Sequence, residues 1–298
     1  MIRQISIIGT GLIGGSVALA LRKHGFDGKI VGCDLPSVWQ RAMKMRVIDA
    51  GVSNPKDAVK GCDVVVLAAP VGVIVELART LGPVLGASTL MTDVGSTKTA
   101  VMKAAVAGFG KNAGRRFLAG HPMAGKETAG IEGADARLFE DAAWFLTPFP
   151  GQNILSGKCG EWVQWIEKMG AKVASMEAQQ HDRLCAWISH LPQMISTGLA
   201  AALVEEFGDD LPLLEAGGRA LREMTRISGS PYSMWRDIAL TNKKHLSHAL
   251  LQMEQKLAHI RENLGERELG VEFEVAHRLK KGGKPRSVAA ATRTGHPI

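Results

Sequence analysis

The sequence has few of the features that mark membrane proteins, disulfide-rich secreted proteins or zinc proteins. No apolar run approaches the roughly 18 residues that cross a bilayer, and the N-terminus leads straight into a glycine-rich turn rather than a signal-type cleavage site. The cysteines are far apart and form no CxxC pair, which argues against a disulfide framework and a zinc site; they are Cys33, Cys62, Cys159 and Cys185. These absences predict a cytoplasmic protein with reduced thiols, no membrane segment and no metal.

Acidic residues are absent from the last 22 residues, which contain six lysine and arginine side chains. The formal net charge of +7 therefore reflects mainly this end of the chain and leaves +1 for the rest. The segment HRLKKGGKPRSVAAATRTGHPI also lacks apolar periodicity. We therefore expect a flexible basic tail over 271–298 and no nucleic-acid partner, with a nucleic-acid-binding arm as the minor alternative.

The P-loop pattern GxxxxGK[ST] is missing, but another nucleotide-binding pattern is present near the N-terminus. In QISIIGTGLIGGSVALAL, a β-branched run leads into a tight turn and then into apolar residues at helical spacing. The turn places Gly9, Gly11 and Gly14 in GxGxxG order. Gly9 permits the turn, Gly11 lets the backbone approach a pyrophosphate, and Gly14 allows close helix packing, while the first helical turn at Leu12 and Ile13 faces the phosphates.

A second predicted strand, KIVGCD, ends at Asp34, 20 residues after Gly14. A carboxylate at this position accepts hydrogen bonds from the adenosine ribose diol and repels a 2′-phosphate. The expected cofactor is therefore NAD rather than NADP.

Strands and helices alternate through residues 1–175, which predicts a Rossmann-type, doubly wound parallel α/β domain. Ligands of such sheets gather at the carboxyl ends of the strands. Three motifs fall there: LAAPVG with Ala69 and Pro70 beside the cofactor, DVGSTK with Ser96, and AGHPMAG with His121. The plainer alternatives are a helix N-cap in the SerThrLys segment and a loop histidine without a role.

Long apolar helices without strands follow over 176–270 and predict a separate all-α domain that forms a homodimer. His190 stands just before Pro192, where a kink can open a cleft. His181 lies nine residues earlier, on the opposite face of an unbroken helix, so both reach one pocket only if the helix bends. Arg226 precedes an SGSP loop, from which a guanidinium can reach a carboxylate.

Five motifs in this order, GTGLIGGS, DVGSTK, GHPMAGKE, HDRLCAWISHLPQ and TRISGSPYSMWRDI, resemble those of the prephenate and arogenate dehydrogenase family of tyrosine biosynthesis. The resemblance runs from about residue 3 to 264. It implies that His121 is the catalytic base and that Ser96 lies beside the substrate hydroxyl and the nicotinamide.

The same resemblance implies substrate-binding positions in the second half of the chain. His190 and Arg226 correspond to substrate-binding residues, Trp235 lines the site or the dimer interface, and Glu127 gates or polarises the pocket. Ser230 stands where members often have an aspartate, which leaves the preference among substrates open.

The implied reaction is the NAD-dependent oxidative decarboxylation of prephenate to 4-hydroxyphenylpyruvate. Three alternatives remain at this stage. An arogenate dehydrogenase would give tyrosine directly, and a β-hydroxyacid dehydrogenase would rely on a lysine such as Lys243 or Lys244. A dinucleotide-sensing regulator without turnover would leave His121, Ser96, His190 and Arg226 unexplained.

Overall fold

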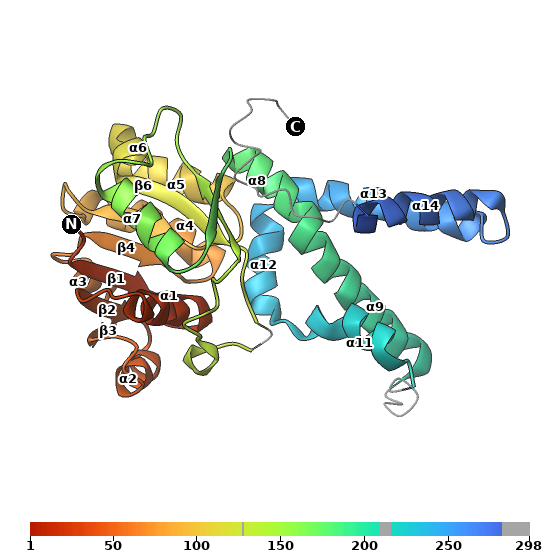
Figure 1. The fold of residues 1–298 in the computed structure, drawn as a ribbon, viewed down its shortest axis with the longest axis horizontal. Helices are drawn as coiled ribbons and strands as arrows, with labels where there is room; N and C mark the ends of the chain where they lie inside the picture. The colour runs from red at the N-terminus through yellow and green to blue at the C-terminus, as the bar shows by residue number, and fades with distance from the viewer. Residues whose placement is uncertain (127, 209–215, 282–298) are drawn as a thin grey trace.

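The computed structural model describes residues 1–126, 128–208 and 216–281. An eight-stranded sheet with helices on both faces forms the first part of the chain, and a group of long helices extends away from it (Figure 1). The strand order is β3-β2-β1-β4-β5-β6-β7-β8. The strands are β1 (Gln4–Ile8), β2 (Lys29–Cys33), β3 (Ala50–Val52), β4 (Val64–Leu67), β5 (Leu90–Asp93), β6 (Phe117–Pro122), β7 (Ala143–Thr147) and β8 (Lys172–Ser175).

Helices connect these strands along the first half of the chain. They are α1 (Leu12–Lys23), α2 (Pro36–Lys44), α3 (Pro55–Ala58), α4 (Val71–Leu81), α5 (Thr99–Phe109), α6 (Ala113–Arg116) and α7 (Gly157–Lys168), with short 3₁₀ turns η1 (Gly82–Val84), η2 (Gly110–Asn112) and η3 (Ile131–Gly133).

The central strands are buried on both faces, which is why they read as continuous β-branched runs. Successive side chains of β4 enter different cores: Val64 and Val66 pack with α1 and α7, whereas Val65 and Leu67 pack with α4 and α5. The strand order reverses between β1 and β4, where a doubly wound sheet opens a crevice at its carboxyl edge. The predicted fold class is confirmed.

The sheet differs from a fully parallel one at β7, which pairs antiparallel with β6. The connection over 123–142 has no α-helix among its described residues and returns at the same edge, so Pro122 pairs with Trp144. A parallel neighbour would need a crossover to the opposite edge. β6 therefore pairs with β5 through its first residues, Phe117 and Leu118, and its last residues pair with an antiparallel partner at the carboxyl edge.

The second half of the described chain is helical. It contains α8 (Ala178–Cys185), the π-helical turn η4 (Ala186–His190), α9 (Leu191–Phe207), α11 (Gly218–Thr225), the 3₁₀ turn η5 (Arg226–Gly229), α12 (Tyr232–Thr241), α13 (Lys243–Glu262) and α14 (Arg267–Lys281). Among the residues that the structure describes, no helix combines the length and apolar character that a membrane crossing requires.

The segment expected as a flexible tail differs from that expectation over 271–281. These residues belong to α14, and an ion pair between Lys256 Nζ and Glu272 Oε1 at 2.8 Å ties α14 to α13. The remaining part, 282–298, lies outside the described residues.

Two carboxylates from the helical half contact helix N-termini of the sheet half. Asp182 of α8 accepts hydrogen bonds from Lys98 N at 2.7 Å and Thr99 N at 2.9 Å, where α5 begins. Asp237 of α12 accepts one from Gly72 N at 3.1 Å, in the first turn of α4. Free N–H groups at a helix N-terminus favour negative charge. These bonds therefore fix the helical half on the carboxyl edge of the sheet.

The turn between β1 and α1 requires glycine at two of the three glycine positions of the GxGxxG pattern. Gly9 has φ +97°, and a Cβ there would lie 2.3 Å from Ala68 O. A Cβ on Gly14 would lie 1.9 Å from Gly9 O. Around Gly11, by contrast, nothing lies within 4 Å of where a Cβ would be. The turn therefore has no room for a side chain at Gly9 or Gly14, whereas a Cβ at Gly11 would meet no neighbouring atom.

We expect Gly14→Ala to lower the free energy of unfolding by about 1–3 kcal/mol or more, because the methyl group collides with the backbone. Gly11→Ala is the matched control and should cost less than about 1 kcal/mol, the range for a changed N-cap. Urea unfolding of both variants measures the difference, and equal losses would contradict the packing described for Gly14.

Candidate active site

The cradle predicted for a dinucleotide lies at the crevice of the sheet. Gly11 is the N-cap of α1 and no side chain caps the helix there, so its first N–H groups face the open space beside Gly11. The helix start, with Leu12 and Ile13, is only partly buried. Backbone donors at an uncapped helix N-terminus, with no side chain in the way, fit a pyrophosphate.

Asp34 follows β2 and its carboxylate is held against the same turn. Oδ2 accepts hydrogen bonds from Thr10 N at 2.7 Å and from Thr10 Oγ1 at 3.3 Å, and Oδ1 accepts one from Leu35 N at 2.8 Å. Ala69 and Pro70 lie in the neighbouring connection from β4 to α4 and are partly or fully exposed. The residues present therefore fit a dinucleotide with a free ribose diol. The cofactor contact of each of these residues remains a prediction.

His121 is the next-to-last residue of β6 and pairs with Phe145 of β7. A buried ion pair between the Lys98 ammonium and the Asp93 carboxylate supports this end of the strand, because Lys98 Nζ also donates to Gly120 O at 2.7 Å. Lys98 and Asp93 are both fully buried. The imidazole is thus held at the carboxyl edge by charge-assisted hydrogen bonds on its own strand.

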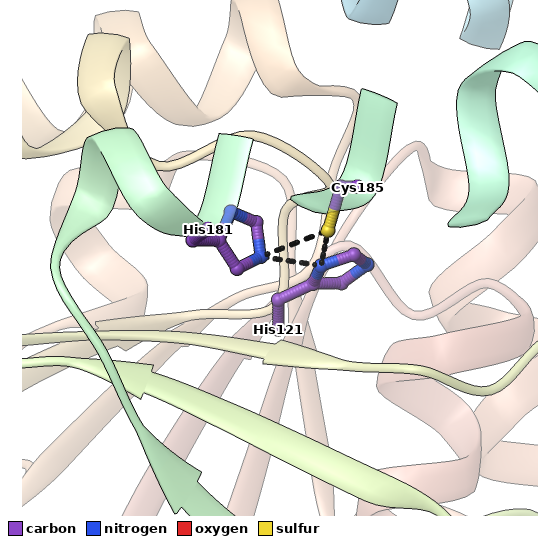
Figure 2. Close-up of side chains that lie close together, drawn as sticks. All are labelled: His121, His181 and Cys185. Carbon is purple, nitrogen blue, oxygen red and sulfur yellow. Dashed lines mark hydrogen bonds between the residues drawn. The ribbon is translucent and has the colours of Figure 1, made fainter. Parts of the chain in front are cut away.

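The ring of His121 contacts a second histidine from the helical half. His121 Nδ1 lies 2.9 Å from His181 Nε2, and His181 Nδ1 lies 2.9 Å from Asp182 Oδ1. Figure 2 shows the other ring nitrogen of His121, Nε2, pointing away from His181 and from the nearby Cys185. The order Asp182, His181, His121 is therefore a continuous hydrogen-bonded chain.

Burial and hydrogen bonding set the protonation of this chain. Burial opposes ionisation of Asp182, but hydrogen bonds from His181, Thr99 and Lys98 outweigh it and keep the pKa of this carboxyl below its usual value. Burial lowers the pKa of His181 despite its bond to Asp182, and burial together with His181 and Lys98 lowers the pKa of His121 well below the usual 6.5. Near neutral pH the carboxyl is ionised and both rings are neutral.

These charges determine which nitrogens carry hydrogen. The Asp182 carboxylate is an acceptor, so His181 donates from Nδ1 and its Nε2 accepts. His121 then donates from Nδ1 to His181, which leaves the lone pair of the His121 ring on Nε2. The arrangement presents a neutral proton acceptor at the carboxyl edge of the sheet.

The π-helical turn η4 brings a third histidine to the site. An unbroken α-helix would place His190 opposite His181, but the wider turn over Ala186–His190 rotates the following residues. His190 lies at the end of this turn and is fully buried; its proximity contributes to the lowered pKa of His121, as that of His181 does to the lowered pKa of His190. Pro192 lies in the first turn of α9 and contributes no backbone donor there. The π-helical turn therefore interrupts the α-helix between His181 and His190.

His190 has the opposite hydrogen-bonding character from His121. Asn242 Nδ2 donates to Asp182 O at 2.7 Å, which orients the amide, and the same nitrogen lies 3.2 Å from His190 Nδ1. His190 Nδ1 is then an acceptor and Nε2 carries the hydrogen. His190 Nε2 is buried and has no hydrogen-bond partner in the described chain. An unused buried donor of this kind suits an oxygen of a bound ligand.

The remaining predicted residues are placed as follows. Trp235 of α12 packs edge-on against His190, with ring centroids 5.9 Å apart. Gln193, one turn after His190, donates to Ile227 O at 2.8 Å and so holds the η5 turn that begins at Arg226. Ser96 lies partly exposed in the loop after β5. Glu127 lies outside the described residues.

The SerThrLys segment does contain the N-cap residue of α5, but it supplies no capping side chain. Lys98 is the N-cap of α5 and no side chain of this segment caps the helix. Thr97 Oγ1 instead lies 2.8 Å from Thr241 Oγ1 of α12, and Asp182 satisfies the N–H groups of Lys98 and Thr99. The N-terminus of α5 is therefore capped by a carboxylate from the helical half.

Three residues that organise the site were not predicted from the sequence. They are Asp182, Asn242 and His181, the last in its role as the partner of His121. The adjacent His and Asp of HDRLC were a usable signal, because an ionised carboxylate commonly orients an imidazole. Asn242 carried no signal, since its contacts join segments 52 and 60 residues away.

We expect the protein to lose stability as the pH falls from about 6.5 to 4. Burial lowers the pKa of His190 to about 4 and also lowers those of His121 and His181, so the unfolded chain binds more protons than the folded chain in this range. Its free energy of unfolding therefore decreases with falling pH, and the depressed pKa of His190 alone accounts for about 3 kcal/mol.

Urea unfolding at several pH values measures this dependence. His190→Gln should flatten it, and the exposed His248→Gln serves as the control that should not. An unchanged slope in His190→Gln would show that His190 does not remain neutral in the folded protein.

Comparison with known proteins agrees with this geometry. The family described as "Prephenate dehydrogenase, nucleotide-binding domain" matches residues 17–174, and "Prephenate dehydrogenase, dimerization domain" matches 177–274. The prephenate dehydrogenase of Lactococcus lactis is 31% identical over 95% of this chain and 80% of its own length. That of Bacillus subtilis is 35% identical over 80% of this chain and 64% of its own length.

A solved structure is similar over nearly the whole chain. It is the prephenate dehydrogenase of Aquifex aeolicus in complex with hydroxyphenyl propionate and NAD⁺, with a TM-score of 0.81 and 31% identity over 94% of this chain and 96% of that one. Sequence and fold agree over both halves of the protein, and the chain belongs to the prephenate dehydrogenase family.

Proposed function

We propose that the protein is an NAD-dependent prephenate dehydrogenase, which converts prephenate to 4-hydroxyphenylpyruvate with formation of CO₂ and NADH. The observation that carries this proposal is the neutral His121, whose Nδ1 is bonded to His181, itself bonded to Asp182, and whose Nε2 is left as a proton acceptor. It stands at the edge of the sheet where the dinucleotide cradle also opens. The family match and the relative solved with NAD⁺ support the same reaction.

In this proposal His121 Nε2 takes the proton of the ring hydroxyl of the substrate. Bound NAD⁺ supplies the acceptor for the hydride that leaves the carbinol carbon. As the carbinol becomes a carbonyl, the ring loses its carboxyl group as CO₂ and becomes aromatic, and the resulting phenolate oxygen takes the proton back from His121. Aromatisation makes the step effectively irreversible, so the protein has mainly to position the substrate and to remove one proton.

His181 and Asp182 act as positioning residues for that proton transfer. By accepting the Nδ1 hydrogen of His121, His181 keeps the lone pair on Nε2, and the Asp182 carboxylate stabilises positive charge that passes to the two rings during the reaction. Because His121 is buried among Lys98 and two other histidines, its charged form needs this compensation.

Substrate binding is assigned to groups on the helical half. His190 donates to a substrate oxygen from Nε2, which has no partner among the described residues, and Trp235 packs edge-on against the His190 ring. Arg226 is the first residue of the η5 turn, which Gln193 holds by a hydrogen bond to Ile227 O. We assign the Arg226 guanidinium to a substrate carboxylate. Ser96 is assigned to the position next to the reacting hydroxyl.

The exposed apolar surface of the helical half bears on the oligomeric state of the protein, and its cysteine thiols bear on its cellular compartment. The arms formed by α9 and α13 leave apolar side chains exposed, including Val204, Phe207, Leu251 and Leu257, and a groove between them contains Met194 and Met253. We assign this surface to a homodimer, in line with the dimerization-domain match. All four cysteines are buried and free, which suits the reducing cytoplasm.

Absorbance at 340 nm tests the reaction directly, with prephenate or arogenate each paired with NAD⁺ or NADP⁺. We expect NADH formation with prephenate and NAD⁺. NADP⁺ should be the poorer cofactor, because the Asp34 carboxylate opposes its 2′-phosphate. His121→Asn should bind NAD⁺ as the wild type does and lose about 10²–10⁴ in turnover. Faster turnover with arogenate would reassign the substrate, and near wild-type turnover of His121→Asn would remove the base.

A pair of His181 variants tests the positioning role. His181→Leu removes the acceptor for His121 Nδ1 and should lower kcat about tenfold, since such a hydrogen bond is worth about 1–1.5 kcal/mol. His181→Gln retains an acceptor oxygen and should recover part of the loss.

The pH profile separates positioning from simple damage to the fold. In the wild type the acid limb of kcat/KM should lie below pH 6.5, because burial lowers the pKa of His121. His181→Leu should move this limb. An unmoved limb together with equal kcat in both variants would overturn the positioning role.

A further inference from the structure

Cys185 lies beside the pair of histidines that the proposed mechanism uses, yet it has no part in that mechanism. Its Sγ is 3.4 Å from His181 Nε2 and 3.8 Å from His121 Nδ1, and these two nitrogens are 2.9 Å apart (Figure 2). All three side chains are buried, and their donor atoms lie within 4.8 Å of one another. Two imidazole nitrogens and a sulfur are a ligand set that suits zinc.

The separations are close to those of a tetrahedral zinc site. Zinc binds nitrogen at about 2.0–2.1 Å and sulfur at about 2.3 Å, so tetrahedral angles place two nitrogens about 3.3 Å apart and nitrogen and sulfur about 3.6 Å apart. The three observed separations differ from these values by less than about 0.5 Å. Small side-chain rotations therefore suffice to admit the ion between the three atoms.

The surroundings of the three atoms favour a divalent cation. Asp182 bonds to the far nitrogen of His181, which is the arrangement in which a carboxylate orients and strengthens a metal-binding histidine. The buried charges nearby are the carboxylates of Asp93 and Asp182 and the ammonium of Lys98, with a formal sum of −1. A divalent cation together with a Cys185 thiolate brings this sum to zero, so the filled site buries no net charge.

We propose that His121, His181 and Cys185 form an inhibitory site for Zn²⁺, an inference that rests on the proposed role of His121 as the base. The ion binds Nδ1 of His121, Nε2 of His181 and Sγ of Cys185 and leaves a fourth position for water. Cys185 releases its thiol proton to solvent, and the hydrogen of His121 moves from Nδ1 to Nε2. A neutral ring with the metal on Nδ1 and hydrogen on Nε2 has no lone pair for the substrate proton, so turnover stops.

Metal binding is measured first, on the full-length enzyme without substrate, so that the result does not depend on the activity. Competition with a chromophoric chelator should show one Zn²⁺ per chain, and Co²⁺ as a probe should give a thiolate-to-cobalt charge-transfer band. Both signals should disappear in Cys185→Ser and in Cys185→Ala, while Cys159→Ser, which replaces a buried thiol of α7, should keep them. Absence of both signals in the wild type would overturn the site whatever the enzyme's activity.

Inhibition is measured second, by turnover after preincubation with Zn²⁺ or with Mg²⁺, which prefers oxygen ligands. Zn²⁺ should inhibit the wild type and Cys159→Ser, a chelator should reverse the inhibition, and Mg²⁺ should have no effect. The inhibition constant should rise at least tenfold in each Cys185 variant. Equal inhibition of these variants, or bound Zn²⁺ without inhibition, would overturn the proposal, whereas turnover without added metal tests the proposed function separately.

Discussion

The Asp182 carboxylate is the interaction on which the rest of the site depends. It accepts the free N–H groups at the start of α5, which fastens the helical half to the sheet, and it accepts the Nδ1 hydrogen of His181, which sets the hydrogen positions of two imidazoles. Its backbone oxygen also orients Asn242 and through it His190. Docking of the two halves and protonation of the site therefore have one physical origin. A buried carboxylate can hold this position only because every hydrogen bond it receives favours its charged form.

Burial gives the site its chemical character. The three histidines are neutral near pH 7 because burial lowers the pKa of each ring. Burial also raises the pKa of Cys185 to about 12, so this side chain remains a thiol beside them. One ring presents an acceptor and another presents a donor, and the difference arises from what occupies the opposite nitrogen of each ring. The same desolvation that keeps His121 ready to accept a proton makes the folded state less stable in acid.

The backbone supplies two local departures from regular structure, and both serve the site. The π-helical turn changes the rotation of the chain between His181 and His190, so these residues do not lie on opposite faces as they would in an unbroken α-helix. The antiparallel strand β7 pairs with the last residues of β6, so that Phe145 lies opposite His121 and packs edge-on against the ring of His181 in α8. A π-turn costs stability relative to an α-helix, and such turns are frequent at functional sites.

The sequence by itself determined the fold class, the glycine turn and the membership of His121, His190 and Arg226 in the family's motifs. It did so because β-branched runs, helical spacing and steric limits at Gly9 and Gly14 act over short distances along the chain. Only the tertiary structure decided that β7 runs antiparallel, that α14 occupies part of the expected tail, and that His181 faces His121. The pairing of His121 with His181 spans 60 residues and the capping of α5 by Asp182 spans 83 to 84. Hydrogen positions and pKa values depend on such contacts and on burial, and neither is expressed in the spacing of residues.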